Sequence, residues 1–433
     1  MPSEWREATI DEIKDPAPGA IAMGPFGSDI KTDNFVPTGV PVIRGNNLGG
    51  RRFKEEGFVF LTEAKADSLR NANAFPGDLV FTHRGTLGQV GLIPEKSRFP
   101  RYVVSQSQMK LTCDRKRADP LFLYYFFISP PGQAELLANA NPTGVPAISQ
   151  PATSLKRIKL RMPPLPIQHA IARILGALDD KIELNRKMNE TLEQMARAIF
   201  KSWFVDFEPF RVKGMVDSPL GKIPKGWSVH PVEDIAKRVA MGPFGSSIKV
   251  ETFVPKGVPV ISGQHLWGIM LDDLDYDFVT PEHADKLCKA NVYRGDVVFT
   301  HAGSIGQVAW VPESSKYERY VISQRQFYMR CDLAKVSPSY VVYYFSSPEG
   351  QHKLLANTSS SGVPSISRPV TYLRSIQMPV PPRRVLDEFE SVVRPVHLQM
   401  RSQVAQSLTL AAIRDALLPK LMSGKVQVEA VAS

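Results

Sequence analysis

Cysteine is scarce in this chain, which has three among its 433 residues. Three cysteines are too few for a disulfide framework, and none stands in the Cys-x-x-Cys spacing of a zinc site. Long hydrophobic runs are also missing, since no stretch approaches the ~18 apolar residues of a membrane span. The polar, acidic start "MPSEWREATIDEI" lacks a signal-peptide pattern. We therefore expect a reduced, cytoplasmic protein that makes no contact with a membrane.

The sequence also lacks the motifs of a self-contained enzyme. The "NPTG" at Asn141 is not the Asn/Asp-Pro-Pro-aromatic loop of adenine methyltransferases, and the glycines after Gly85 lack the Lys-Ser/Thr ending of a phosphate-binding loop. His83 and His301 have no paired acid or cysteine at a telling spacing, which favours hydrogen-bonded structural histidines. Residues 206–213, "DFEPFRVK", hint at a nuclease carboxylate cluster but are better explained as a helix end and linker. We expect no catalysis, metal or cofactor in this chain.

A long internal repeat is the main feature that the chain does contain. "MGPFGSDIK" from Met23 returns as "MGPFGSSIK" from Met241, 218 residues later. The same offset aligns "FVPTGVPVIRGNNL" with "FVPKGVPVISGQHL" and "GDLVFTHRGTLGQVGLIPE" with "GDVVFTHAGSIGQVAWVPE". Between residues 21–50 and 239–268, 20 of 30 positions are identical. A whole domain is therefore duplicated, because a solenoid unit spans only ~20–50 residues.

Each copy is followed by a helical sequence. In residues 167–203 the apolar side chains alternate at three- and four-residue steps, which predicts a coiled-coil seam with a polar centre. Residues 383–422 carry a looser stripe, in which Pro395 is expected to kink or restart the helix. The polar centre has an alternative explanation, a solvated stretch where two helices diverge. The side chains expected in the seam and in partner docking are Lys181, Asn185, Met188, Leu192, Met195 and Ile199.

The order of these segments predicts the fold class. Short β-rich stretches such as "GVPVI" and "DLVFT", punctuated by Gly and Pro, predict strands, whereas residues 120–140 predict two helices. We predict an α+β protein in which two long antiparallel coiled-coil helices separate two similar mixed α/β domains with pseudo-two-fold symmetry. The predicted segments are a first globular domain at 1–164, a first long helix at 165–206, a linker with the second domain at 207–382, and a second long helix with a tail at 383–426.

Charge and loop composition indicate a polyanionic partner. The net charge is +10 with pI ≈ 9.4, and Asn, Gln and Arg are the side chains that pair with adenine and guanine edges. In Gly-rich loops such residues also cap turns, and their differences between the copies fit either two related readers or neutral drift. We assign the repeated "MGPFGS" to backbone geometry rather than to phosphate binding. Candidate base contacts are Arg44, Asn46, Asn47, Arg84, Gln106 and Gln108 in the first copy and Gln264, His265, Gln324, Arg325 and Gln326 in the second. Candidate phosphate contacts are Lys31, Lys156, Arg157 and Lys249.

The sequence resembles a type I restriction-modification specificity (S) subunit. The resemblance rests on "PPLPIQHAIARILGALDDKIELNRKMNETLEQMARAIFKSWFVDFEP", "SPLGKIPKGWSV", "GDLVFTHRGTLGQVG" with its twin, and "LLPKLMSGKV". It implies that each copy is a target recognition domain for one half of a bipartite double-stranded DNA site. It also implies that the helices dock two modification subunits, which use S-adenosylmethionine to methylate adenine at N6. Restriction subunits that use ATP and Mg can join, while this chain is non-catalytic and holds no cofactor.

The repeat and the helices suggest how such a subunit works. Equivalent domains imply inverted half-sites and, because the copies are so alike, a nearly palindromic target. A helix over 167–203 is about 55 Å long, or about sixteen base pairs, so the helix pair would set the spacer between half-sites. The alternative is a protein–protein interaction scaffold without DNA readout. A self-contained DNA-modifying enzyme is disfavoured by the missing motifs.

Overall fold

The computed structural model divides into two compact units. The first contains residues 1–185 and 405–433, and the second contains residues 186–404. The division falls inside both long helices, α6 (Leu165–Phe204) and α12 (Arg383–Met422), so each unit contains one globular domain and part of each helix. The predicted domain boundaries, drawn at helix ends, remain predictions. The structure describes residues 5–141, 143–245, 247–359 and 362–429.

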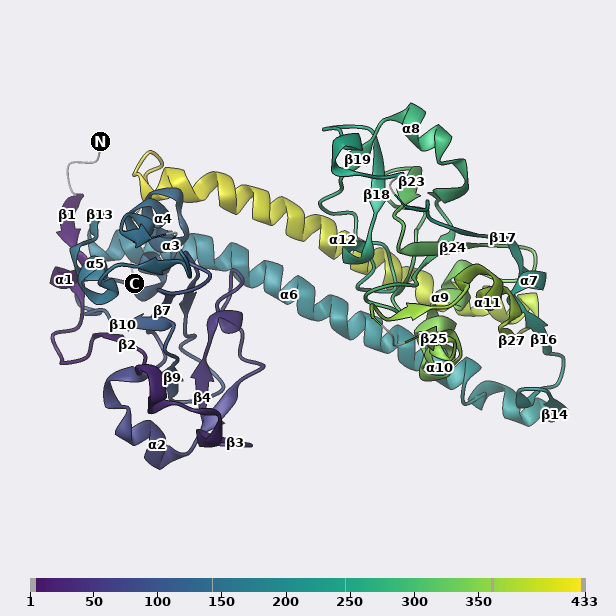
Figure 1. Cartoon of the computed structure of the whole chain (residues 1–433), viewed down its shortest axis with the longest axis horizontal. Helices are drawn as coiled ribbons and strands as arrows, with labels where there is room; N and C mark the ends of the chain where they lie inside the picture. Colours follow the sequence, from purple (N-terminus) through teal and green to yellow (C-terminus); the bar gives the residue numbers. More distant parts are fainter. Residues whose placement is uncertain (1–4, 142, 246, 360–361, 430–433) are drawn as a thin grey trace. The chain divides into compact units, whose positions relative to one another are not determined.

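The first unit is a mixed α/β domain with two small sheets (Figure 1). Their strand orders are β2-β10-β7-β8 and β3-β5-β4-β9-β6, and a separate pair is formed by β1 and β13. The strands are β1 Arg6–Thr9, β2 Ile21–Met23, β3 Phe35–Val36, β4 Val40–Ile43, β5 Val59–Leu61, β6 Asn73–Ala74, β7 Leu79–Thr82, β8 Val90–Leu92, β9 Tyr102–Val104, β10 Gln108–Leu111, β11 Ala140–Asn141, β12 Ala147–Ile148 and β13 Lys159–Met162. The helices before α6 are α1 Ile10–Ile13, α2 Glu63–Ser68, α3 Pro120–Ile128, α4 Pro130–Leu137 and α5 Pro151–Arg157.

The second unit repeats this topology with sheet orders β17-β24-β21-β22 and β19-β18-β23-β20. Its strands are β14 Met215–Ser218, β15 Gly221–Pro224, β16 Ser228–Pro231, β17 Ala236–Met241, β18 Val258–Ile261, β19 Phe278–Val279, β20 Asn291–Tyr293, β21 Asp296–Thr300, β22 Val308–Trp310, β23 Arg319–Ile322, β24 Gln326–Cys331, β25 Thr358–Ser359, β26 Ser365–Ile366 and β27 Gln377–Val380. Its helices before α12 are α7 Val232–Ile235, α8 Pro281–Lys286, α9 Pro338–Ser346, α10 Pro348–Leu355 and α11 Pro369–Ser375.

The structural repeat extends further than the fixed offset of 218 residues aligns. Strand β1 pairs with β13, Arg6 lying opposite Met162, and β16 pairs with β27, Ser228 lying opposite Val380. The offset from Arg6 to Ser228 is 222, four more than in the rest of the repeat. The extra four residues lie in the connection from α1 to β2, which spans 14–20, whereas its counterpart spans only 236–238 before Val239. The N-terminal strand and helix therefore belong to the duplicated domain.

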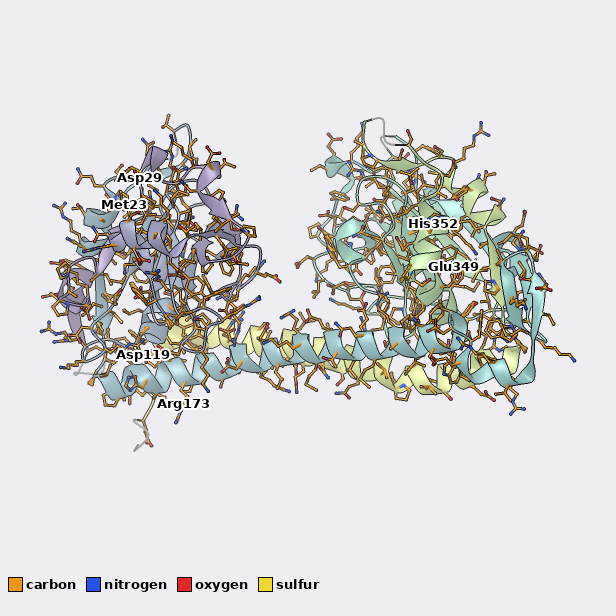
Figure 2. All side chains as sticks on the ribbon, turned by 90° about the horizontal axis from the view of Figure 1, so that it is seen from below. Met23, Asp29, Asp119, Arg173, Glu349 and His352 are labelled. Carbon is orange, nitrogen blue, oxygen red and sulfur yellow. The ribbon has the colours of Figure 1, made fainter. Side chains whose placement is uncertain are left out.

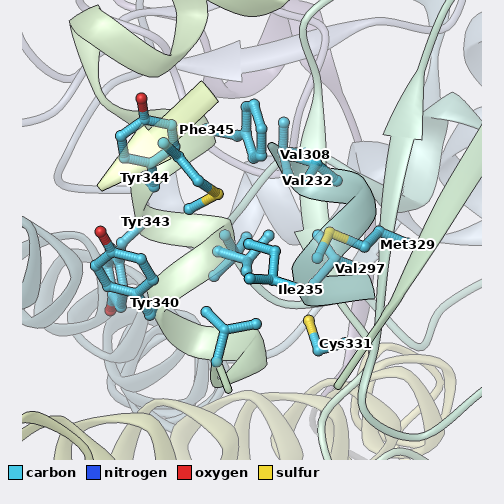
Figure 3. Close-up of a cluster of buried hydrophobic side chains, with 14 of the residues drawn as sticks. Val232, Ile235, Val297, Val308, Met329, Cys331, Tyr340, Tyr343, Tyr344 and Phe345 are labelled. Carbon is cyan, nitrogen blue, oxygen red and sulfur yellow. The ribbon is translucent and has the colours of Figure 1, made fainter. Parts of the chain in front are cut away.

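In each unit the globular domain and the helix pair share one hydrophobic core. Figure 3 shows this core in the second unit, where Phe345 of α9 lies beside Val308 of the sheet and Tyr340 and Tyr343 project from the other side of the helix. The same cluster includes Phe200 of α6 and Phe389 of α12. In the first unit the equivalent cluster joins α3 to Ile171 of α6 and to the end of α12. The long helices are thus part of the fold of each unit.

The helix segments in the first unit are antiparallel. The Arg414 guanidinium contacts the Asp179 carboxylate at 2.5 Å, and the Asn185 side chain donates a hydrogen bond to Gln406 Oε1 at 2.9 Å. Residue numbers therefore rise along α6 as they fall along α12. In the described residues, no helix is long and apolar enough to cross a membrane.

The predicted seam is partly wrong towards the end of α6. Met188 and Met195 are exposed, whereas Ala196 and Phe200 are buried. An α-helix has 3.6 residues per turn, so a strict 3.5-residue pattern drifts off the packed face, here by one position. Asn185 lies on the packed face and is 1% exposed. The other members of the predicted seam are partly buried: Lys181, Leu192 and Ile199.

Pro395 does not restart the second long helix, because α12 is continuous from Arg383 to Met422. The proline removes the amide that would bond to the carbonyl of Ser391. Both residues are exposed, so water can bond to that carbonyl and the helix continues.

One buried polar contact differs between the units and predicts a pH dependence. The hydroxyl of Tyr343 lies 2.8 Å from Nε2 of buried His397, and burial lowers the pKa of His397 to about 4. The unfolded chain, with a histidine pKa near 6.5, binds the proton more tightly. The free energy of unfolding of the second unit should fall by about 3 kcal/mol as the pH drops from 6.5 to 4.

Urea unfolding of the full chain at several pH values measures this loss. Burial also lowers the pKa of His265 and His301, so the comparison must isolate one side chain. His397→Asn removes the titration and keeps a polar partner for Tyr343. An identical pH slope for both proteins would contradict the assignment.

Candidate nucleic-acid interface

Four loops of the first domain meet at one end of its sheets. Strand β10 pairs with β2 and with β7, so Gln108 lies opposite Thr82 and Met109 opposite Met23. Strand β4 runs parallel to β9, with Ile43 beside Val104. The loops that follow β2, β4 and β7, and the turn from β9 to β10, therefore start at the same end. We call this region the loop edge: residues 24–27, 44–47, 83–85 and 105–108 in the first domain, and 242–245, 262–265, 301–303 and 323–326 in the second.

The loop edge of the first domain surrounds a hollow of about 310 Å³. Figure 2 labels Met23 and Asp29, which flank the MGPFGS loop and lie on the side of the domain away from the start of α6 near Arg173. The hollow brings together three of the four loops. Its lining includes Pro25, Gly27, Arg44, Gly45, Ser105 and Gln106.

The first glycine of MGPFGS is required by a close approach of two backbones. Gly24 N donates to Gln108 O at 2.9 Å, and a Cβ at Gly24 would lie 1.9 Å from Ser105 O. The second copy repeats both features, with a bond from Gly242 N to Gln326 O. These contacts agree with a backbone role for this segment.

Gly24→Ala should displace the 105–108 turn. Because the clash is with a backbone oxygen, we expect a loss of about 1–3 kcal/mol of stability. DNA binding through the first domain should weaken as well. Thermal melting and DNA affinity of the full chain measure the two effects. Gly49→Ala is the matched control, since its Cβ would meet its nearest atom at 3.6 Å. A Gly24 variant that behaves like the Gly49 variant would contradict this role.

Two glutamines predicted to contact bases are buried instead. Gln108 is 2% exposed; it accepts a hydrogen bond from Ser105 Oγ and donates to Thr82 Oγ1, which donates to Gln89 Oε1. Gln326 makes the equivalent contacts in the second domain. A buried amide with these partners cannot reach a base edge while the turn keeps this conformation. Both predictions are corrected: these glutamines hold the loop edge together.

Asn47 and His265 require the same correction. The Asn47 side chain is fully buried. It accepts a hydrogen bond from Arg44 N at 2.9 Å and donates to the carbonyls of Lys54 and Glu56 at 3.0 Å. At the equivalent position, His265 Nδ1 accepts from Ser262 N at 3.0 Å and the ring stacks on Tyr276. Burial lowers the pKa of His265, which favours the neutral ring. Both side chains fix the loop after the central strand of their sheet.

The remaining candidate base contacts lie at the loop edges and are not buried. Arg44 is half-buried and donates to Gly57 O at 2.9 Å, so it is partly engaged within its own domain. Gln264 makes two weak contacts, to Asp275 O at 3.3 Å and to His265 Nε2 at 3.4 Å. The fully exposed candidates are Asn46, Arg84 and Gln106 in the first domain and Gln264, Gln324 and Arg325 in the second. Their contacts with bases remain predictions.

The equivalent histidines His83 and His301 lie at the start of one loop of each loop edge. His301 Nε2 lies 3.1 Å from Gln324 O, and burial lowers the pKa of the His301 imidazole. Burial lowers the pKa of His83 in the same way. These contacts agree with structural histidines. Among the described residues, no group of three or more His, Cys, Asp or Glu side chains is arranged to hold a metal ion.

The candidate phosphate contacts are all exposed. Lys31 and Lys249 occupy equivalent positions just before a short 3-10 turn in the loop that begins with MGPFGS. Lys156 and Arg157 end α5. Exposure leaves all four side chains free to reach a phosphate, and their contacts with DNA remain predictions.

Comparison with known proteins finds similar sequences in one family. The family model for the type I restriction modification DNA specificity domain matches residues 25–194. The type I restriction enzyme MjaIX specificity subunit of Methanocaldococcus jannaschii is 26% identical, over 99% of this chain and 95% of its own length. The chain is therefore similar to type I restriction-modification specificity subunits. The HindI specificity subunit of Haemophilus influenzae is 23% identical, over 75% of this chain and 81% of its own length.

The fold of this chain also occurs in a solved structure. The crystal structure of the S subunit from M. genitalium matches with a TM-score of 0.57 and 15% identity, over 96% of both chains. The comparisons confirm the predicted likeness to type I specificity subunits, and the solved structure supports the predicted α+β fold class with its long helices. They give no support to the interaction-scaffold alternative.

The sequence did not reveal the buried hydrogen bonds that connect the loops of each loop edge. Ser105, Gln108, Thr82 and Gln89 form one hydrogen-bonded chain, and all four recur at the offset of 218. That recurrence could have indicated their structural role, because buried residues that hold the loops together are the same in both domains, whereas the exposed loop residues differ.

Proposed function

We propose that each globular domain reads one half of a bipartite double-stranded DNA site through its loop edge. The observation that carries this proposal is that the two loop edges have the same buried hydrogen bonds but different exposed side chains. The Ser–Gln–Thr–Gln hydrogen-bonded chain occurs in both domains. Above it, Asn46 is replaced by Gln264, and Arg84 by Ala302. Arg and Asn or Gln make the commonest paired hydrogen bonds to guanine and adenine, so such differences alter sequence preference.

The chemistry is assigned to partner subunits. Two modification subunits with S-adenosylmethionine would dock on the helix pair and methylate adenine at N6, and restriction subunits that use ATP and Mg would join them. The helix pair would set the number of unread bases between the half-sites. Because the two loop edges share their buried hydrogen bonds, the half-sites are proposed to be similar and inverted, which gives a nearly palindromic target.

Methylation mapping tests this function. The full chain is expressed with methyltransferase partner subunits from its own cell, and N6-methyladenine is mapped across the host genome. We expect one bipartite motif that disappears when this chain is left out. Binding of the assembled complex to that motif should weaken steeply with salt, because Lys31, Lys249 and their neighbours release counterions from phosphates. Methylation that does not depend on this chain would contradict the proposal.

A further inference from the structure

Each domain exposes a phenylalanine at the same position of the repeat. Phe26 is 73% exposed and Phe244 is 78% exposed, and both stand in the segment MGPFGS. A single exposed apolar side chain needs no explanation. Two equivalent exposed rings need one, because nearby exposed positions such as Thr32 and Val250 have changed between the copies. The shared ring therefore points to a shared contact outside the chain.

The backbone that carries each ring is anchored on its own domain. In the first domain, Gly24 is anchored on the 105–108 turn, Pro25 fixes its own φ, and Phe26 O accepts from Asp29 N at 3.1 Å. In the second domain, Phe244 O accepts from Ser247 Oγ at 2.9 Å. A ring on an anchored loop loses little conformational freedom on binding, which suits insertion into a stacked surface.

The position of the ring matches the candidate base contacts. Its neighbours Pro25 and Gly27 line the same hollow as Arg44 and Gln106. The ring of Phe26 therefore stands at the loop edge, beside the side chains proposed to read bases.

Another equivalent pair of exposed aromatics provides a contrast. Phe75 precedes β7, at the opposite end of the sheet from the loop edge, and Lys110 lies 5.8 Å from its ring. Arg330 lies 5.1 Å from the ring of Tyr293, the equivalent residue. These two rings already have a cationic partner within their own domain. Within the described ranges, Phe26 and Phe244 have neither a cationic nor an aromatic partner.

We propose that Phe26 and Phe244 are wedges that insert between base pairs of the two half-sites. This inference rests on the proposed function and adds a way of reading it: the cost of opening a base step depends on the sequence being opened. Apolar side chains that enter the base stack in this way partly unstack it and kink the duplex by about 20–90°. Specificity would then come from deformability as well as from hydrogen bonds.

The test uses the full chain assembled with its methyltransferase partners and duplexes that carry the mapped motif. The adenine analogue 2-aminopurine replaces one base at a time in each half-site, because its fluorescence rises when it is unstacked. The methyltransferase itself flips out the adenine that it modifies, so the wild-type complex should raise the signal at one further step in each half, away from that adenine. Phe26→Ala should abolish the rise in the first half and weaken binding by about 5- to 150-fold. Phe244→Ala should do the same in the second half, and Phe26→Trp should keep the rise.

The controls separate this inference from the proposed function. Phe75→Ala and Tyr293→Ala remove rings that are 47% and 42% exposed at the far end of the sheet, and they should leave the signal and the affinity unchanged. If the wild-type complex binds the motif while the Phe26→Ala and Phe244→Ala variants bind equally well with the same signal, the wedge is overturned alone. Loss of partner subunits from the alanine variants, with DNA signals intact, would overturn it in favour of a protein contact. A wild-type complex that binds no DNA would overturn the proposed function and the wedge together.

Discussion

Replacing Asn46, Arg84 and Gln106 with alanine is expected to erase the sequence preference of one half-site and to leave the other intact. These three side chains are exposed at the loop edge of the first domain and are not part of its buried hydrogen-bonded chain. Each paired hydrogen bond to a base is worth about 1–3 kcal/mol of discrimination, so the triple variant should lose at least about 30-fold in preference if two of them read bases. Methylation mapping with the variant chain measures the result directly, as a motif that is degenerate in one half.

A matched substitution at the other end of the sheet controls for lost charge. Arg115 is exposed and paired with Glu95 next to Phe75, far along the strands from the loop edge. Arg115→Ala removes the same charge as Arg84→Ala and should leave the motif unchanged. If the triple variant methylates the wild-type motif, or if both halves degrade together, the loop edge is not the reading surface of one half-site.

Arg414→Ala should have the largest effect on stability. Arg414 and Asp179 form an ion pair in which both side chains are less than a tenth exposed, and the hydroxyl of Tyr125 donates to the same carboxylate at 2.7 Å. Removing one partner of a buried pair leaves the other charge uncompensated, which costs about 3–5 kcal/mol. Urea unfolding of the full chain measures this loss, which we expect in the transition of the first unit.

An exposed ion pair in the same unit is the comparison. Arg52 and Asp180 also form a pair at 2.5 Å, with side chains that are 43% and 74% exposed. Arg52→Ala should cost less than about 1 kcal/mol, because exposed pairs contribute little. The double variant Asp179→Leu with Arg414→Leu should recover much of the loss, since no charge is left buried. Equal losses for Arg414→Ala and Arg52→Ala would contradict a buried, structural pair.

The contact in the second unit that corresponds to Tyr125–Asp179 could not be predicted from sequence. At the offset of 218, Tyr125 corresponds to Tyr343 and Asp179 to His397, so an acid in one unit is replaced by a neutral ring in the other. Which side chain faces Tyr343 depends on how α12 packs on the domain, and that contact joins residues 54 positions apart. Periodicity places residues on a helix face but does not name their partners.

Much of the fold could be predicted because strong local patterns agree with the final packing. The β-rich stretches between Gly and Pro became strands β4, β7, β8 and β9, and residues 120–140 formed the expected pair of helices. Errors arose where a pattern was extended beyond what it determines. A 3.5-residue step placed Met195 in the seam where the helix turns Ala196 inward, and a fixed offset missed the four-residue difference before β2.

The candidate site was predicted at the level of loops rather than of side chains. The sequence indicated which loops carry Asn, Gln and Arg, and the structure brings those loops together. The sequence did not indicate which polar side chains are buried. Gln106 and Gln108 are the same residue type two positions apart, yet Gln106 is exposed in the turn and Gln108 is buried at the start of β10. The exposure of Phe26 was not predicted either, because a phenylalanine is ordinarily expected to be buried.

Domain replacement tests most directly whether each domain reads one half-site. Residues 228–380 are replaced by residues 6–162, which begin and end on the equivalent paired strands. With two copies of the first domain, the methylated motif should consist of two inverted copies of the half-site that the first domain reads, at the wild-type spacing. A motif that keeps a base found only in the second wild-type half-site, or one altered in both halves, would contradict the account.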